Sequence, residues 1–202
     1  MGKKLKCIEI VLFIVAFVWL GGLLADKQAL REDILRLHVV AASDSEEDQA
    51  VKLQVRDAIL GSLQEGLSDL TDVEKAKEYV LEMLPKLEEA ANQVLSEAGF
   101  DEKATVTLTQ EEFPVREYDS FTLPSGVYNA LRVVIGEGEG HNWWCVVFPQ
   151  LCISATAEEF AEVSNFSDTM NDTLTGQYEI RFWLLDKLGQ IENFFHSASD
   201  GA

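Results

Sequence analysis

Alternation of apolar and polar positions is clearest between Ser125 and Cys152. Leu131, Val133 and Ile135 alternate with Ala130, Arg132 and Val134, the two-residue period of a strand with one buried face. A glycine-rich run, GEGEG (136–140), follows and is suited to a tight reversal. Residues 143–148 are apolar on both faces, which favours a second strand inside the sheet rather than at its edge. The pattern therefore predicts a central hairpin.

The preceding segments predict one strand and two helices. Ile34–Ala41 alternates, with Leu35, Leu37 and Val39 on a core face and Arg36 and His38 on the other. Capping boxes of the S/T-x-x-E type open both helices. They are Ser43 with Glu46, for a helix to about Gly66, and Thr71 with Glu74, for an amphipathic helix closed by Gly99.

The later segments predict a short strand, a loop and a last helix. Ala104–Leu108 has the strand pattern, and Gln110–Pro124 is an aromatic, proline-containing loop, either exposed as a contact surface or packed on the hairpin. Tyr178–Leu188 predicts a helix that Gly189 closes, although Glu179–Phe182 also alternates like a strand.

Together the elements predict an α+β fold with a mainly antiparallel sheet of about four strands, in the order β-α-α-β-β-β-α, and helices on one face. In the alternative, the sheet is more open and the C-terminal helix covers its second face. We expect residues 1–25 to be a signal peptide or N-terminal anchor helix and 26–189 a single domain with an acidic loop at about 154–177. Residues 190–202 are expected to be a flexible C-terminal tail.

The N-terminal segment has the composition of an export signal. Lys3, Lys4 and Lys6 precede an uncharged apolar run of 15 residues, Ile10–Leu24. A membrane-spanning helix needs about 20 residues, whereas the apolar region of a signal peptide needs about 7–15. Cleavage is expected after Ala25, but Leu23 fits the −3 position poorly, so an uncleaved anchor is the alternative. In both cases the body leaves the cytoplasm.

Charge and composition narrow the function classes. The net charge is −19 over 202 residues, which argues against binding to nucleic acid or to anionic lipid. With 47% hydrophobic residues, the chain is too apolar for a disordered acidic protein. We expect membrane contact only through the N-terminal segment, if it is uncleaved.

No constellation predicts catalysis, a metal or a cofactor. The GEGEG run carries Glu137 and Glu139, which would repel phosphate. His141 and Cys145 on one strand would lie about 13 Å apart, too far for a nucleophile pair. Cys145 and Cys152 are either a disulfide formed in an oxidising compartment or two buried thiols.

Two runs resemble a known family: ILRLHVVAASDSEEDQAVKLQVRDAIL (34–60) and LPSGVYNALRVVIGEGEGHNWWCVVFPQLC (123–152) are similar to stage II sporulation protein R of endospore-forming bacteria. The likeness covers about Ile34–Cys152, and the last helix also fits. It implies a signal exported from the forespore into the space between the two sporulation membranes. There it would activate a membrane-embedded aspartic peptidase of the mother cell, which processes pro-sigma-E.

The resemblance transfers no catalytic residues. Eight positions in the two runs are candidates for contact with the partner, although capping, ion pairs and core packing explain most of them equally well: Asp44, Ser45, Asp48, Gln49, Arg56, Asp57, Trp143 and Trp144. The alternatives are an exported hydrolase, of the cell wall for example, that uses Cys145 or an acidic pair, and an anchored structural protein of the septum. No small-molecule substrate is expected.

Overall fold

The computed structural model describes residues 2–118, 121–149, 168–176 and 179–200. Its main sheet has four strands in the order β2-β5-β1-β6. β1 (Leu35–Val40) runs parallel to β5 (Gly126–Ile135) and antiparallel to β6 (Asn142–Phe148), and β2 (Ala104–Phe113) is antiparallel to β5. The predicted four-stranded, mainly antiparallel sheet is therefore confirmed.

The predicted central hairpin is wrong, because β1 lies between β5 and β6. The turn after β5 pairs with the end of β1 instead: the N–H groups of Glu139 and Gly140 donate to Ala42 O and Ala41 O. Glycine is required in this turn, since Gly136 and Gly138 have φ values of 57° and 69°. β6 consequently lies at the edge of the described sheet, and its two apolar faces reflect helical layers on both sides.

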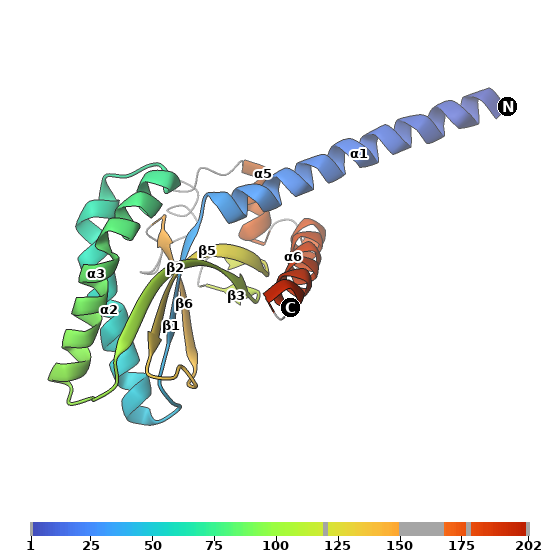
Figure 1. Cartoon of the computed structure of the whole chain (residues 1–202). Helices are drawn as coiled ribbons and strands as arrows, with labels where there is room; N and C mark the ends of the chain where they lie inside the picture. Colours follow the sequence, from blue (N-terminus) through green and yellow to red (C-terminus); the bar gives the residue numbers. More distant parts are fainter. Residues whose placement is uncertain (1, 119–120, 150–167, 177–178, 201–202) are drawn as a thin grey trace.

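Two long helices cover the first face, as Figure 1 shows. α2 (Glu46–Ser68) and α3 (Val73–Glu97) pack on the side chains of Leu35, Leu37 and Val39 from β1. The helices begin where predicted, but the capping residues differ. In α2, Ser45 Oγ accepts the N–H of Asp48 at 3.0 Å. In α3, Asp72 Oδ1 accepts the N–H groups of Glu74 and Lys75 in the first turn. In α2 the N-cap is Ser45 rather than Ser43, because only the Ser45 hydroxyl reaches the free N–H groups of the first turn.

The second face is also covered, so the expectation of helices on one face only is wrong, and the C-terminal helix covers the second face as in the alternative. The end of α1 (Gly2–Glu32), α5 (Asp168–Leu174) and α6 (Glu179–Asp200) lie on this side. Leu23 and Leu30 of α1 and Leu185 of α6 are each 1% exposed, and they pack with Ile34 and Tyr128. The α+β class is confirmed, with one core on each side of the sheet.

α6 does not end at Gly189 but continues to Asp200. A Cβ at Gly189 would lie 1.6 Å from Ser125 O, so glycine allows the helix to approach the start of β5. Beyond it, Asn193 Nδ2 donates to Phe113 O at 3.2 Å. The expected flexible tail from residue 190 is therefore helical as far as residue 200.

The aromatic segment before β5 is structured and packed. β2 extends to Phe113, and β3 (Arg116–Glu117) pairs with β4 (Thr122–Leu123) in a two-stranded sheet. Phe113 and Phe121 are buried in the second core, which favours the packed alternative over an exposed contact surface. Residues 154–167 of the expected acidic loop lie outside the residues that the structure describes, and residues 168–174 form α5.

Candidate functional site

Four candidate contact residues lie where β1 leads into α2. Asp44 Oδ1 accepts the backbone N–H of His141 at 2.6 Å and also contacts His141 Nδ1. Gln49 Nε2 donates to Ser43 O at 2.8 Å, and Ser43 Oγ donates to Asp48. With Ser45 as the N-cap, these side chains join the start of α2 to the turn between β5 and β6.

A lysine that the sequence analysis missed completes this junction. Lys52 is 4% exposed and donates to Gln49 Oε1 at 2.5 Å and to His141 O at 2.9 Å. Burial lowers the pKa of Lys52, and the negative charge of Asp44 opposes that change. The available signal was its spacing, since Lys52, Val55 and Ile59 recur on the buried stripe of α2.

Arg56, Asp57 and Trp143 form a second group beside the junction. Arg56 Nε donates to Asp57 Oδ1 at 2.8 Å, and the Arg56 guanidinium lies 4.4 Å from the centre of the Trp143 ring. The Trp143 ring packs against the first core. The Asp57 side chain, on α2, remains 64% exposed, and that of Asp44, just before α2, 56%, so both carboxylates reach solvent.

Trp144 belongs to the opposite face, because successive residues of a strand point to opposite sides. Its ring stacks on His38 at 3.7 Å and meets Phe113 edge-on at 4.6 Å. His38 Nδ1 lies 3.0 Å from Glu111 Oε2, and His38 Nε2 lies 2.8 Å from Asn142 Oδ1. The structure therefore does not bring Trp143 and Trp144 into one site.

The same face buries a guanidinium. Arg36 is fully buried and lies 4.0 Å from the ring centre of Phe113 and 4.9 Å from that of Tyr128. Its Nη2 donates to Tyr118 Oη at 2.7 Å, while Nε and Nη1 have no hydrogen-bond acceptor among the residues that the structure describes. Loss of hydration lowers the pKa of Arg36 and raises that of Tyr128. This cluster is an internal support for the second layer and offers no accessible reacting group.

Cys145 offers no nucleophilic thiol. Cys145 is 4% exposed and disulfide-bonded, so it has no free thiol, whereas Cys7 is free and exposed. Cys152 lies outside the described residues, and its pairing with Cys145 stays a prediction. Among the residues that the structure describes, no group of three or more His, Cys, Asp or Glu side chains could hold a metal ion.

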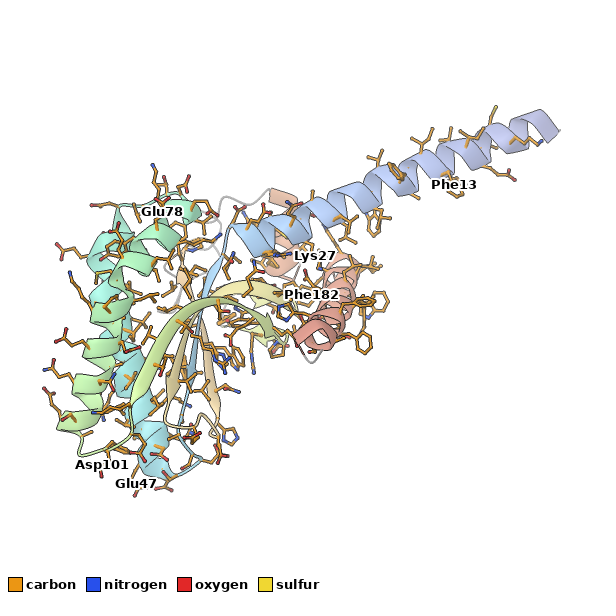
Figure 2. All side chains as sticks on the ribbon, viewed as in Figure 1. Phe13, Lys27, Glu47, Glu78, Asp101 and Phe182 are labelled. Carbon is orange, nitrogen blue, oxygen red and sulfur yellow. The ribbon has the colours of Figure 1, made fainter. Side chains whose placement is uncertain are left out.

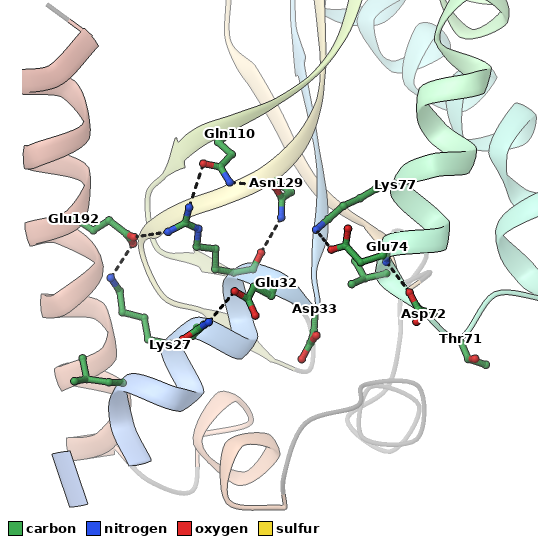
Figure 3. A pocket seen from close by; sticks show the side chains of 14 residues that line it. Lys27, Glu32, Asp33, Thr71, Asp72, Glu74, Lys77, Gln110, Asn129 and Glu192 are labelled. Carbon is green, nitrogen blue, oxygen red and sulfur yellow. Dashed lines mark hydrogen bonds and ion pairs between the residues drawn. The ribbon is translucent and has the colours of Figure 1, made fainter. Parts of the chain in front are cut away.

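A polar cavity of about 930 Å³ lies between α1, α3, β2, β5 and α6 (Figure 3). Its charged side chains are largely paired: Lys27 with Glu192 at 2.8 Å and Lys77 with Glu74 at 2.7 Å. Burial, followed by the neighbouring charge of Glu32, raises the pKa of Asp33. The lining carries five carboxylates and three cationic side chains, and this excess of negative charge would repel anions.

α1 combines an apolar, exposed part with a docked end. Within residues 6–32, the most apolar 18-residue window has a mean hydropathy of 2.6. The helix is long and apolar enough to cross a membrane, as a signal sequence near the N-terminus also is. Most large apolar side chains before Leu24 are exposed, while Leu23 and Leu30 are buried in the second core. Asp26 forms an ion pair with Arg181 of α6. The apolar helix therefore leaves the domain close to α6.

Comparisons with known proteins match more than half of this chain. The family model described as stage II sporulation protein R matches residues 31–158. The protein of that name from Bacillus subtilis (strain 168) is 31% identical over 159 residues, which cover 74% of this chain and 71% of that protein. No solved structure matches the chain.

Proposed function

Because this chain belongs to the stage II sporulation protein R family, we propose that it is a signalling protein exported from the forespore that activates a membrane-embedded aspartic peptidase of the mother cell. The activated peptidase would then remove the pro-sequence of sigma-E. The site of action would be the space between the two sporulation membranes.

The family match carries this proposal, since it spans the residues that build the whole sheet and the α2–α3 layer. Two further observations support it. An apolar N-terminal helix is compatible with export. Cys145 is disulfide-bonded and so has no thiol for the hydrolase alternative. A ligand of this kind activates its receptor only by binding the active conformation more tightly than the inactive one.

We propose the contact surface at the α2 side of the molecule. Of the eight candidate residues, Ser45, Asp48 and Gln49 are engaged in capping and in the junction with the β5–β6 turn. The carboxylates of Asp44 and Asp57 are largely exposed and could meet basic groups of the peptidase. Charge complementarity of this sort acts mainly on association rate and specificity.

The test is co-expression of the full chain with its cognate peptidase and the sigma-E precursor, with the precursor followed by gel mobility. Cleavage that depends on the exported chain supports the proposal. If the chain is exported and folded but no cleavage occurs, the activator function is refuted.

The contact surface is tested with a charge-matched pair of variants. Asp57→Lys should reduce cleavage strongly, whereas Glu89→Lys, an equal charge change at an exposed position of α3, should not. Equal activity of both variants would remove Asp57 from the contact surface without affecting the proposed function.

A further inference from the structure

α6 presents an apolar face to solvent in addition to the face it buries. Five large apolar side chains of this helix are between 54% and 76% exposed: Ile180, Trp183, Ile191, Phe194 and Phe195. At 3.6 residues per turn they fall within an arc of about 120°, in which Lys187 is the only charged residue. A continuous apolar face of this kind marks a surface that is covered in the working protein.

The contacts between α1 and α6 fix the direction of this helix. Arg181 pairs with Asp26, and Glu192 pairs with Lys27 at 2.8 Å. Arg181 and Glu192 are separated by about 16 Å along α6, whereas their partners on α1, which are Asp26, Lys27 and Arg31, span only about 8 Å along that helix. The two helices therefore cross at a steep angle, and Figure 1 shows α6 running across the direction of α1.

The crossing lies where the apolar part of α1 ends. Leu24 is 50% exposed, and the charged residues Asp26 and Lys27 follow at once. If α1 spans a bilayer close to its normal, α6 lies near the surface of that bilayer and roughly in its plane. In Figure 2 the side chains on the outer face of α6, away from the sheet, extend to the right, and the free part of α1 also runs to the right.

We propose that α6 is a membrane-surface helix, with its exposed apolar face in the interfacial layer of the lipid beside the point where α1 enters the bilayer. Tryptophan favours this layer, and phenylalanine is typical of the apolar face of interfacial helices. Lys187 can extend its ammonium group to water from such a position. Because the chain is strongly acidic, apolar insertion rather than attraction to anionic headgroups supplies the contact.

The assignment requires that α1 stays attached to the domain. Leu23 is 1% exposed in the second core, although it precedes the expected cleavage point after Ala25. Cleavage there would remove a core side chain and divide the docked part of α1. The membrane contact is thus extended from the N-terminal segment to α6, and it does not depend on the proposed activation of a peptidase.

The test uses the full chain in phosphatidylcholine vesicles whose acyl chains carry bromine near the headgroups, which quenches nearby tryptophan. The emission of Trp183 is obtained as the difference between the wild type and Trp183→Phe. We expect this component to lose most of its intensity in brominated vesicles. Trp143→Phe, in the first core, is the matched control and should remove emission that bromine does not quench.

A second variant separates surface contact from insertion of α1. Phe194→Asp with Phe195→Asp alters only exposed positions, so it should leave the fold intact but restore most of the Trp183 emission. Trp19, in the apolar part of α1, should stay quenched in both proteins. The proposal is overturned if Trp183 is not quenched, or if Trp19 is not. If Trp183 becomes shielded from water only after a membrane peptidase is added, this face of α6 contacts a protein rather than lipid, and the proposal is also overturned.

Discussion

Replacing Gly189 by alanine tests the close packing of α6 on the sheet. The new Cβ would lie 1.6 Å from Ser125 O, 2.4 Å from Ser125 C and 3.1 Å from Gly126 N. All three are backbone atoms at the start of β5, so no side chain can rotate away from the methyl group. The helix must move outward, and that movement stretches the hydrogen bonds that join Ser125 to Asp186.

The magnitude follows from three contributions. Alanine is favoured over glycine inside a helix by about 1 kcal/mol. Overpacking of a close contact costs about 1–3 kcal/mol. Ser125 donates two hydrogen bonds to Asp186, one from its N–H at 3.1 Å and one from its hydroxyl, which lies 2.6 Å from Asp186 Oδ1 and 2.9 Å from Asp186 O. The loss of each costs about 1 kcal/mol. We expect the free energy of unfolding to fall by about 3 kcal/mol in Gly189→Ala.

The assay is urea unfolding of the full chain in detergent, followed by near-ultraviolet circular dichroism. Gly61→Ala is the matched control, because Gly61 lies inside α2 and no atom comes within 4 Å of the added Cβ. Its stability should rise by up to about 1 kcal/mol. A midpoint for Gly189→Ala at or above that of the wild type would refute the close approach of α6 to β5.

Three other variants test buried polar groups by the same unfolding assay. Tyr118→Phe should lower the free energy of unfolding by about 1–3 kcal/mol, since it removes the hydroxyl that accepts from the buried Arg36. Adding Arg36→Met should lower it little further, and a fully additive loss in the double variant would contradict this. Lys52→Met should also cost about 1–3 kcal/mol and speed proteolysis of the 136–140 turn, because the carbonyl of His141 loses its donor; unchanged proteolysis would contradict that role. The raised pKa of Asp33 makes its ionised form destabilising, so stability increases as pH falls through the folded pKa toward the ordinary value of 3.8. Asp33→Asn should therefore stabilise the protein at pH 7, by less than about 1 kcal/mol because the group is only partly buried, and this gain should disappear near pH 3.

The elements of the fold were largely predictable, because hydrophobic periodicity is a local property of the chain. The alternation in Ile34–Ala41 assigned Leu37 to one face and Arg36 to the other, as observed. The starts of both long helices were also predicted, within a few residues. The resemblance that identified the family rested on uninterrupted runs of residues and needed no structure.

The candidate site was only half predictable. Asp44, Gln49 and the neighbouring residues were identified from their runs, but their partners come from distant segments, such as His141, 97 residues from Asp44. Lys52 was overlooked because its burial depends on the β5–β6 turn closing over it. Local pattern cannot supply a partner that only folding brings near.

The sequence by itself determined the α+β class, the apolar N-terminal helix, the inward and outward residues of each strand, and the family. Only the tertiary structure decided that β1 separates β5 from β6 and that helices cover both faces. It also decided that α6 continues through Gly189. The physical reason is that a two-residue period specifies which face a side chain occupies but not which strand lies beside it. In the same way, the place of a glycine in a helix depends on how closely another backbone approaches, and that is set by packing between distant parts of the chain.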